Sequence, residues 1–308
     1  MKGKINLSCV FCNVKFKSPL ISPSGIVVDQ EKIIDLSQIK GVGGLTTKSS
    51  SILPREGHSP PTVSAFKAGF INAVGLKNPG MINSKREIMF LKKRINKPII
   101  ASVFGTKLAD FSILVKEISE SKPDIIELNL SCPNVDDEFG KPFATDPLLT
   151  AMAVIEAKKV VQKIPIIAKL TPNTPYLNRV AYEVEKAGAD GISAINTVGP
   201  GMLINLKKRK PILSNCLGGV SGPAIKPIAL RCVNEIKKTV KIPIIGMGGV
   251  ETGKDALEMI MAGATLVGVG SAIYQGGFKI FDKIIKEMKE IMTEEKISSI
   301  NSIRGSLK

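Results

Sequence analysis

The sequence has a single histidine, His58, no tryptophan, and five cysteines without regular spacing. One histidine excludes a multi-histidine zinc or di-iron site, and a Ser-His-Asp triad would depend on His58 alone. An odd number of irregularly spaced cysteines is typical of reduced thiols, so we expect a cytoplasmic protein without a metal site. Cys9 and Cys12 have CxxC spacing, but no second such pair follows, and we expect them to be structural.

Long hydrophobic runs are also absent. No window approaches 18 consecutive apolar residues, and the start MKGKINLSCVF has no hydrophobic signal region. We therefore expect no transmembrane helix, no secretory signal and no membrane partner. Aromatic residues make up only 5%, which leaves few rings for stacking nucleic-acid bases. The formal charge of +16 is the only indication of a nucleic-acid partner. Because the lysines are spread along the chain without a basic block, we expect none.

Short apolar runs recur along the chain, entered from Pro or Gly and left through Gly, Ser, Thr or Asn. Their continuous Ile, Val and Leu, without polar alternation, are typical of parallel strands covered on both faces. The eight runs are Pro19–Gly25, Gly43–Ser49, Pro98–Gly105, Asp124–Ser131, Pro165–Pro172, Gly191–Val198, Pro243–Val250 and Ala264–Ala272.

Helix-like segments lie between most of these runs. We expect helices over Ala151–Lys163, Asn178–Ala187, Pro227–Val240, Gly253–Met261 and Phe278–Met292. The alternation of eight strands with helices favours a (β/α)8 TIM barrel, an α/β fold, over a doubly wound sheet. Lys4–Phe16 is predicted to form a short N-terminal β-hairpin that closes the barrel bottom. No linker or low-complexity segment is evident, so we expect residues 1–308 to form a single domain.

Two lysines, Lys48 and Lys169, sit inside otherwise apolar predicted strands. An unpaired ammonium would be costly to bury there. We therefore expect both side chains to meet an anionic or electron-rich ligand at the strand ends, where barrels of this kind have their active sites. Structural ion pairs are the alternative.

Glycine-rich segments cluster late in the chain, at Gly218–Gly222, Gly246–Gly249 and Gly268–Ser271. Glycine lets backbone N–H groups approach a phosphate closely, and a following helix N-terminus adds its dipole. Pro223 is a suitable first residue for such a helix. The last two segments fall on the seventh and eighth strands, where barrels often bind phosphate, so we expect a phosphorylated cofactor. No GxGxxG opens a βαβ unit, which argues against a nicotinamide-binding Rossmann domain.

The segment ELNLSCPN, Glu127–Asn134, places Cys132 at the exit of the fourth strand among polar side chains. A thiol in that position is suited to act as a base or nucleophile. The alternative is a cysteine that packs as a small hydrophobic residue.

Taken together, these segments resemble the class 1 dihydroorotate dehydrogenases, the flavoenzymes of pyrimidine synthesis. The matching segments are SPSG (Ser22–Gly25), TTKS (Thr46–Ser49), INAVGLKNPG (Ile71–Gly80), ELNLSCPN, AKLTPN (Ala168–Asn173), INTV (Ile195–Val198), GGVSGPAIKPIALR (Gly218–Arg231) and GMGGV (Gly246–Val250). They extend over almost the whole chain. The last two are most similar to the NAD-linked subclass 1B.

The resemblance implies that the protein oxidises dihydroorotate to orotate, with Cys132 as the catalytic base that takes the C5 proton while the C6 hydride passes to FMN. The implied substrate-binding residues are Lys48, Asn72, Ala73, Val74, Gly75, Leu76, Asn129, Asn134, Asn196 and Thr197. The implied FMN-binding residues are Ser24, Lys48, Ser49, Ser102, Asn129, Lys169, Ile195, Gly222, Gly248, Gly249, Gly270 and Ser271. Ser102 and Ser271 stand where the family often has Asn and Thr, and the loop after Asn134 is acidic.

Subclass 1B also implies a partner. In it the FMN barrel pairs with a separate subunit that carries FAD and a [2Fe–2S] cluster, around a homodimeric core within a heterotetramer. Two alternatives stay open. One is the FMN barrel of dihydropyrimidine dehydrogenase, which typically has His where Asn134 follows Pro133. The other is a non-catalytic, flavin-free barrel, against which the intact Lys48, Cys132 and Lys169 argue.

Overall fold

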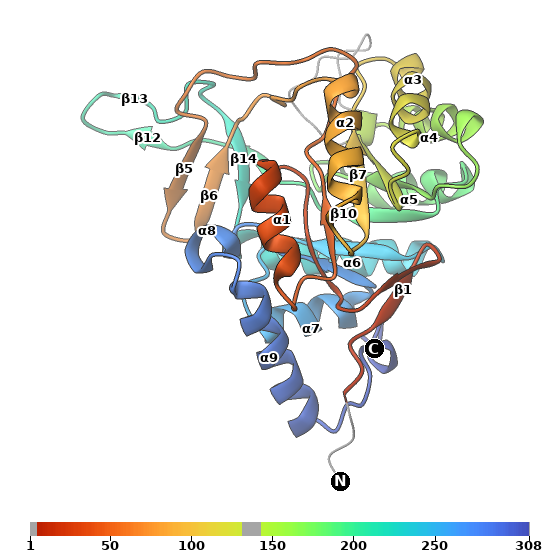
Figure 1. Cartoon of the computed structure of the whole chain (residues 1–308). Helices are drawn as coiled ribbons and strands as arrows, with labels where there is room; N and C mark the ends of the chain where they lie inside the picture. Colours follow the sequence, from red (N-terminus) through yellow and green to blue (C-terminus); the bar gives the residue numbers. More distant parts are fainter. Residues whose placement is uncertain (1–4, 131–142, 308) are drawn as a thin grey trace.

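The computed structural model describes residues 5–130 and 143–307. Eight parallel strands close into a barrel in the order β3-β4-β7-β8-β9-β10-β15-β16 (Figure 1). The strands are β3 (Leu20–Ser22), β4 (Gly44–Thr46), β7 (Ile99–Val103), β8 (Ile125–Asn129), β9 (Ile166–Lys169), β10 (Gly191–Ala194), β15 (Ile244–Met247) and β16 (Leu266–Gly268). Each lies inside one of the eight predicted runs, so the predicted (β/α)8 barrel is confirmed.

The prolines that enter three of the strands have a direct role in the barrel. Pro98, Pro165 and Pro243 each precede a strand whose residues are all buried. A proline has no N–H to donate, but its carbonyl still accepts. The three carbonyls accept hydrogen bonds of 2.9–3.0 Å from Leu45, Ile126 and Ile192 N–H, respectively, on neighbouring strands. These prolines therefore join the rim of the barrel without interrupting its hydrogen bonding.

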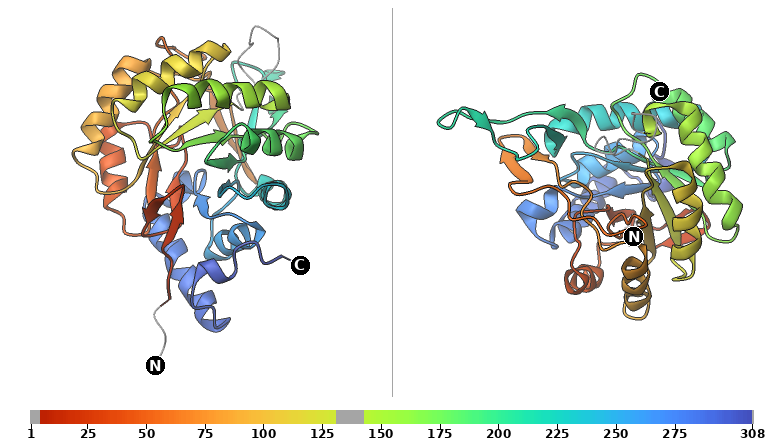
Figure 2. Two further views of the ribbon diagram at one scale, coloured as in Figure 1. Left: turned by 90° about the vertical axis from the view of Figure 1, so that its right-hand side faces the viewer. Right: turned by 90° about the horizontal axis from the view of Figure 1, so that it is seen from above.

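Helices surround the barrel, as the view from above shows (Figure 2). They are α1 (Gln30–Gln38), α2 (Met81–Lys92), α3 (Leu108–Ser119), α4 (Pro147–Val160), α5 (Leu177–Lys186), α6 (Lys226–Thr239), α7 (Gly253–Ala262), α8 (Ala272–Gly276) and α9 (Ile280–Glu294). Short 3-10 turns are η1 (Phe143–Thr145), η2 (Pro223–Ile225) and η3 (Ile300–Ser302). The five predicted helices correspond to α4, α5, α6, α7 and α9. Gly188 and Gly263, with φ of +92° and +129°, follow α5 and α7 as expected of helix stops.

The predicted N-terminal hairpin is also present, as β1 (Cys9–Phe11) and β2 (Val14–Phe16). Its fully buried rings lie against the first residues of two barrel strands. A Cβ built on Gly44 would lie 2.6 Å from the Phe16 ring, and one on Gly191 would lie 2.9 Å from the Phe11 ring. The hairpin therefore closes the end of the barrel where the strands begin.

The CxxC pair belongs to this hairpin. Cys12 Sγ donates to the carbonyl of Asp190 at 3.1 Å. Burial raises the pKa of both Cys9 and Cys12 to about 12. Thiols held protonated in this way are poor nucleophiles, which agrees with the structural role expected for them.

A second sheet beside the mouth of the barrel was not predicted from the sequence. It is antiparallel, in the order β11-β14-β6-β5, and carries a projecting hairpin at the upper left of Figure 1. The strands are β5 (Val63–Phe66), β6 (Gly69–Asn72), β11 (Val198–Gly201) and β14 (Gly218–Ser221), and the hairpin is β12 (Ile204–Asn205) and β13 (Lys210–Pro211). The segment Gly218–Gly222 was predicted from its glycines to bind a phosphate. Most of it is instead strand β14, and only Gly222 lies at the start of the turn η2.

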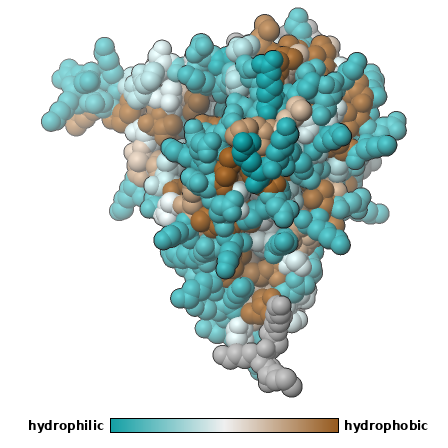
Figure 3. All heavy atoms as spheres, viewed as in Figure 1, coloured by the Kyte–Doolittle hydropathy of each residue, from teal (hydrophilic) through white to brown (hydrophobic). Residues whose placement is uncertain are grey.

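The surface agrees with the even spread of lysines in the sequence. The face in Figure 3 is mostly hydrophilic, with hydrophobic side chains in small separate groups. Within the described part of the chain, no helix combines the length and apolarity that a membrane span requires.

Candidate functional site

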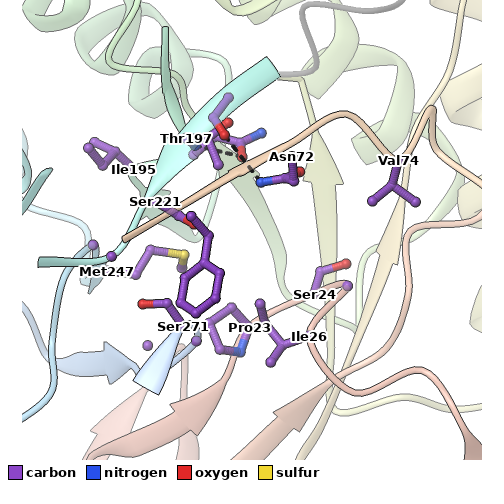
Figure 4. A pocket seen from close by; sticks show the side chains of 18 of the residues that line it. Pro23, Ser24, Ile26, Asn72, Val74, Ile195, Thr197, Ser221, Met247 and Ser271 are labelled. Atoms are coloured by element: carbon purple, nitrogen blue, oxygen red, sulfur yellow. Dashed lines mark hydrogen bonds between the residues drawn. The ribbon is translucent and has the colours of Figure 1, made fainter. Parts of the chain in front are cut away.

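A pocket opens at the carboxyl ends of the barrel strands and is covered on one side by the antiparallel sheet. Most residues predicted for the site line it. They are Ser24, Lys48, Ser49, Asn72, Ala73, Val74, Gly75, Leu76, Asn129, Lys169, Ile195, Asn196, Thr197, Gly222, Gly248, Gly249, Gly270 and Ser271. In Figure 4, Asn72 and Thr197 lie on one side of the pocket, and Pro23, Ser24 and Ser271 lie across from them.

One predicted residue, Ser102, does not line the pocket. Ser102 is 1% exposed and lies beneath the pocket floor, where its hydroxyl donates to Glu127 Oε1 at 2.9 Å. Cys132 and Asn134 lie outside the described residues, so their predicted roles stay predictions.

Both lysines expected to meet a ligand line the pocket. Lys169, at the end of β9, is only 6% exposed, and Lys48 follows β4. Gly25 (φ +81°) leaves room for Lys48, because a Cβ there would lie 3.3 Å from the ammonium nitrogen. The described lining includes these two lysines and no carboxylate. The pocket therefore favours an anionic ligand.

Glycines form a backbone cradle on the side of strands β15 and β16. Gly222, Gly248 and Gly249 have φ of +97°, +133° and +71°, a conformation that glycine adopts without strain. A Cβ on Gly249 would lie 2.8 Å from the carbonyl oxygen of Gly222, so the two segments meet backbone to backbone. Gly222 leads into η2 and α6, whose N-terminal dipole favours a nearby anion. This cradle fits the phosphate group predicted from the sequence.

Two salt bridges link α6, which follows Gly222, to α7, which follows Gly248 and Gly249. Lys226, the first residue of α6, lies 2.5 Å from Asp255 Oδ1 and 2.9 Å from Glu258 Oε2 on α7. The other oxygen of Asp255 accepts from the backbone N–H groups of Glu251 and Thr252. Burial acts to raise the pKa of Asp255, but the hydrogen bonds from Lys226 and from the Glu251 amide outweigh it, and the pKa lies below its ordinary value.

Asp255→Asn should lower the melting temperature at pH 7 by roughly 3 °C. The folded state depresses the pKa of Asp255. Its carboxylate therefore stabilises the protein at pH values above the unfolded pKa of about 3.9. That contribution is lost as the pH falls through the lower, folded pKa. The difference in melting temperature should therefore shrink below about pH 4. Thermal unfolding from pH 7 down to pH 3.5 measures it, with Asp35→Asn on the exposed side of α1 as the control. A difference that stays constant with pH would contradict this role.

The opposite wall presents amide groups. Asn72 Nδ2 donates to the carbonyl of Gly219 at 3.3 Å, and Thr197 N–H donates to Asn196 Oδ1 at 2.8 Å. Asn173 Nδ2 holds the carbonyl of Thr197 at 3.2 Å. Amide side chains supply both donors and acceptors, so this wall is suited to a ring with alternating N–H and C=O groups.

The only histidine of the sequence supports the wall segment that runs from Ala73 to Leu76. His58 N–H donates to the carbonyl of Val74 at 3.1 Å, and its Nδ1 lies 3.1 Å from the carbonyl oxygen of Ala73. Gly75 (φ +72°) packs against it, because a Cβ there would lie 2.6 Å from His58 N. His58 thus positions the pocket wall.

Several lining residues were missed from the sequence. Phe70 on β6 and Tyr274 on α8 form a tilted ring pair with centroids 5.4 Å apart, and both line the pocket. Phe70 belongs to the sheet that was not predicted, and Tyr274 follows the glycine turn by only a few residues. No motif in the sequence marks either ring.

A (β/α)8 barrel with a pocket at the carboxyl ends of its strands is the usual architecture of a barrel enzyme, and comparison with known proteins shows which family it belongs to. The family model described as dihydroorotate dehydrogenase matches residues 6–292. Three relatives carry the name "Dihydroorotate dehydrogenase B (NAD(+)), catalytic subunit". That of Pyrococcus horikoshii is 41% identical over 292 residues, 95% of this chain and 94% of its own. That of Methanothermobacter thermautotrophicus is 39% identical over 97% of this chain and 97% of its own. That of Alkaliphilus metalliredigens is 39% identical over 99% of this chain and 99% of its own.

The chain belongs to the dihydroorotate dehydrogenase family. The resemblance stated from the sequence motifs is thereby confirmed, including the similarity to the NAD-linked catalytic subunits.

Proposed function

We propose that this protein is the catalytic subunit of an NAD-linked dihydroorotate dehydrogenase, which oxidises (S)-dihydroorotate to orotate in the synthesis of UMP. The observation that carries the proposal is the convergence, in one pocket, of two lysines, an amide wall and a glycine cradle. The lysines and the glycine cradle were expected from the residues themselves, and the amide side chains were implied by the family resemblance. A flavin-free barrel without catalytic function would have no need for all three in one place.

FMN is the cofactor that the pocket would hold. The backbone of Gly222, Gly248, Gly249 and Gly270, with Ser271, would bind its phosphate. Lys169 would face the flavin ring, where a buried positive charge favours the accumulation of electrons. Bound FMN supplies the hydride acceptor for C6 of the substrate.

The amide wall would bind and orient the substrate. Asn72, Asn129, Asn196 and Thr197 offer donors and acceptors to the pyrimidine ring, and Lys48 offers a cation to its negative charge. Ala73, Val74, Gly75 and Leu76 shape the wall against which the ring would lie. Asn134 would add a further amide. Cys132 would take the proton from C5, as its counterpart does in the family that the sequence resembles.

A separate subunit with FAD and a [2Fe–2S] cluster would carry the electrons to NAD. The names of three relatives, each a catalytic subunit, support the existence of a second subunit. We further propose that residues 1–308 form a single domain, that a homodimer is the core of the complex and that it works in the cytoplasm.

The cofactor assignment is tested on protein purified without its partner. Denaturation should release one FMN per chain, identified by chromatography against FMN and FAD standards. The same preparation should not reduce NAD until an iron–sulfur partner is added. Release of FAD, or colourless protein from riboflavin-supplied cells, would contradict the cofactor. Rapid NAD reduction by this chain alone would contradict the proposed partner.

A further inference from the structure

A carboxylate is buried at the centre of the barrel, beneath the pocket, and the proposed reaction does not use it. Glu127 on β8 is 2% exposed. Two hydroxyls from other strands donate to it, Ser102 Oγ to Oε1 at 2.9 Å and Ser193 Oγ to Oε2 at 2.7 Å. The serine is the donor in both bonds, and a serine hydroxyl has a single hydrogen, so both serines have that hydrogen committed to Glu127.

One of these serines connects the carboxylate to the pocket. Ser49 Oγ lies 2.9 Å from Ser102 Oγ, and Ser24 Oγ lies 3.1 Å from Ser49 Oγ. Asn129 Nδ2 also donates to Ser49 Oγ at 3.1 Å. Ser24, Ser49 and Asn129 line the pocket. We call the series Glu127, Ser102, Ser49 and Ser24 the hydroxyl chain.

The commitment of Ser102 determines the direction of every later bond in the hydroxyl chain. A serine hydroxyl has one hydrogen and two lone pairs. Since Ser102 donates its hydrogen bond to Glu127, Ser49 must donate to Ser102. Since the hydrogen of Ser49 is then used, Ser24 must donate to Ser49.

Ser49 is therefore saturated, because it donates once and accepts from both Ser24 and Asn129. Ser24 keeps its lone pairs for the pocket but has no hydrogen to offer. From this we propose that Glu127 is a positioning residue: through the hydroxyl chain it makes Ser24 an obligatory acceptor, which selects an N–H or O–H donor of the bound FMN. This inference rests on the proposed function, which supplies FMN as the ligand.

Two serine variants form a matched test, because each removes one hydroxyl from Glu127 and only one belongs to the hydroxyl chain. Ser102→Ala frees the hydrogen of Ser49, which can then turn to Ser24 and force the Ser24 hydrogen toward the ligand. The Ser102→Ala apoprotein should bind FMN about tenfold more weakly than the parent. This is the expected loss when the hydrogen bond between Ser24 and a donor of FMN is replaced by two donors that face each other. Ser193→Ala should change the affinity less than twofold. Ser102→Thr, which restores a hydroxyl, should restore the affinity.

The readouts are titration of apoprotein by quenching of FMN fluorescence and the visible spectrum of the bound flavin. Both are independent of turnover. Thermal unfolding of the apoproteins should show similar losses for Ser102→Ala and Ser193→Ala, because each leaves one oxygen of Glu127 without a partner. A purely structural role for Glu127 would make the two variants alike in FMN binding as well.

A second set of variants keeps the test decisive if Ser102→Ala folds poorly. Ser24→Ala removes the acceptor itself and should weaken FMN binding by a similar factor. The double variant Ser24→Ala, Ser102→Thr should bind FMN no more weakly than Ser24→Ala alone. In the double variant Ser24→Ala, Glu127→Gln, the losses of FMN affinity caused by the two single substitutions should not add, because residues in one network are coupled. Additive losses, or equal responses of the Ser102 and Ser193 variants, would overturn the inference. Parent apoprotein that binds no FMN would overturn the proposed function itself.

Discussion

Replacing Cys132 by serine should slow the reduction of bound flavin by dihydroorotate by about 10²–10⁴-fold at pH 7, the usual contribution of a general base. A thiol ionises near pH 8.5, whereas a serine hydroxyl is a far weaker acid and offers almost no oxyanion at neutral pH. The rate should recover in part as the pH rises. Binding of FMN and orotate should stay close to that of the parent, because the two side chains are similar in size.

Anaerobic single-turnover reduction, followed at the flavin absorbance, separates this step from the electron acceptor. Cys216→Ser is the matched control, because Cys216 is an exposed free thiol that does not line the pocket. Cys232 is a poorer control, because it is fully buried on α6 and its substitution would disturb packing. If Cys132→Ser reduced its flavin as fast as the parent, the base would have to be another residue.

Lys169→Met should lower the rate of flavin reduction by about 10²-fold or more, the typical cost of removing one preorganised electrostatic contact. Methionine keeps the length of the side chain and removes its charge. Lys169 is almost fully buried in the pocket wall, and its loss leaves Lys48 as the one cation among the described lining residues. The reduction potential of the bound flavin should become more negative as well.

The control for this variant is Lys186→Met on the exposed surface of α5, which makes the same chemical change away from the pocket. Spectroelectrochemical titration measures the potential, and stopped-flow absorbance measures the rate. A Lys169→Met protein with unchanged potential and unchanged rate would show that the ammonium does not act on the flavin.

The barrel could be predicted because its strands carry their own signal. A run such as PIIAKL must be covered on both faces, and all four residues of β9 are indeed buried. The helix stops at Gly188 and Gly263 are equally local, because they depend only on the left-handed backbone of one residue. The carboxyl ends of all barrel strands lie at the same face, so polar residues at these ends lie close together. Lys48 and Lys169 line one pocket for this reason.

The antiparallel sheet could not be predicted in the same way. Strand β14 consists of GGVS and pairs with β6, which lies some 150 residues earlier. Glycine is a poor strand former, so the pairing depends on a contact between distant segments that leaves no periodic pattern. Phe70 was missed for this reason.

Ser102 shows a different limit. It lies near the end of β7, inside the predicted run Pro98–Gly105, but depth along the barrel axis is set by the stagger of neighbouring strands. Ser102 pairs with Glu127 in the register of β7 and β8, one layer below the pocket floor. Its contact with Ser49 and Glu127 became visible only in three dimensions, and so did the hydroxyl chain.

The most direct test of the central claim is the anaerobic addition of dihydroorotate to the purified, oxidised protein. The flavin absorption band should bleach completely, with one orotate formed per FMN, in the absence of NAD and of any partner subunit. A band that dihydroorotate leaves unchanged, but that dihydrouracil bleaches, would contradict the proposed substrate and favour a dihydropyrimidine dehydrogenase-like reaction.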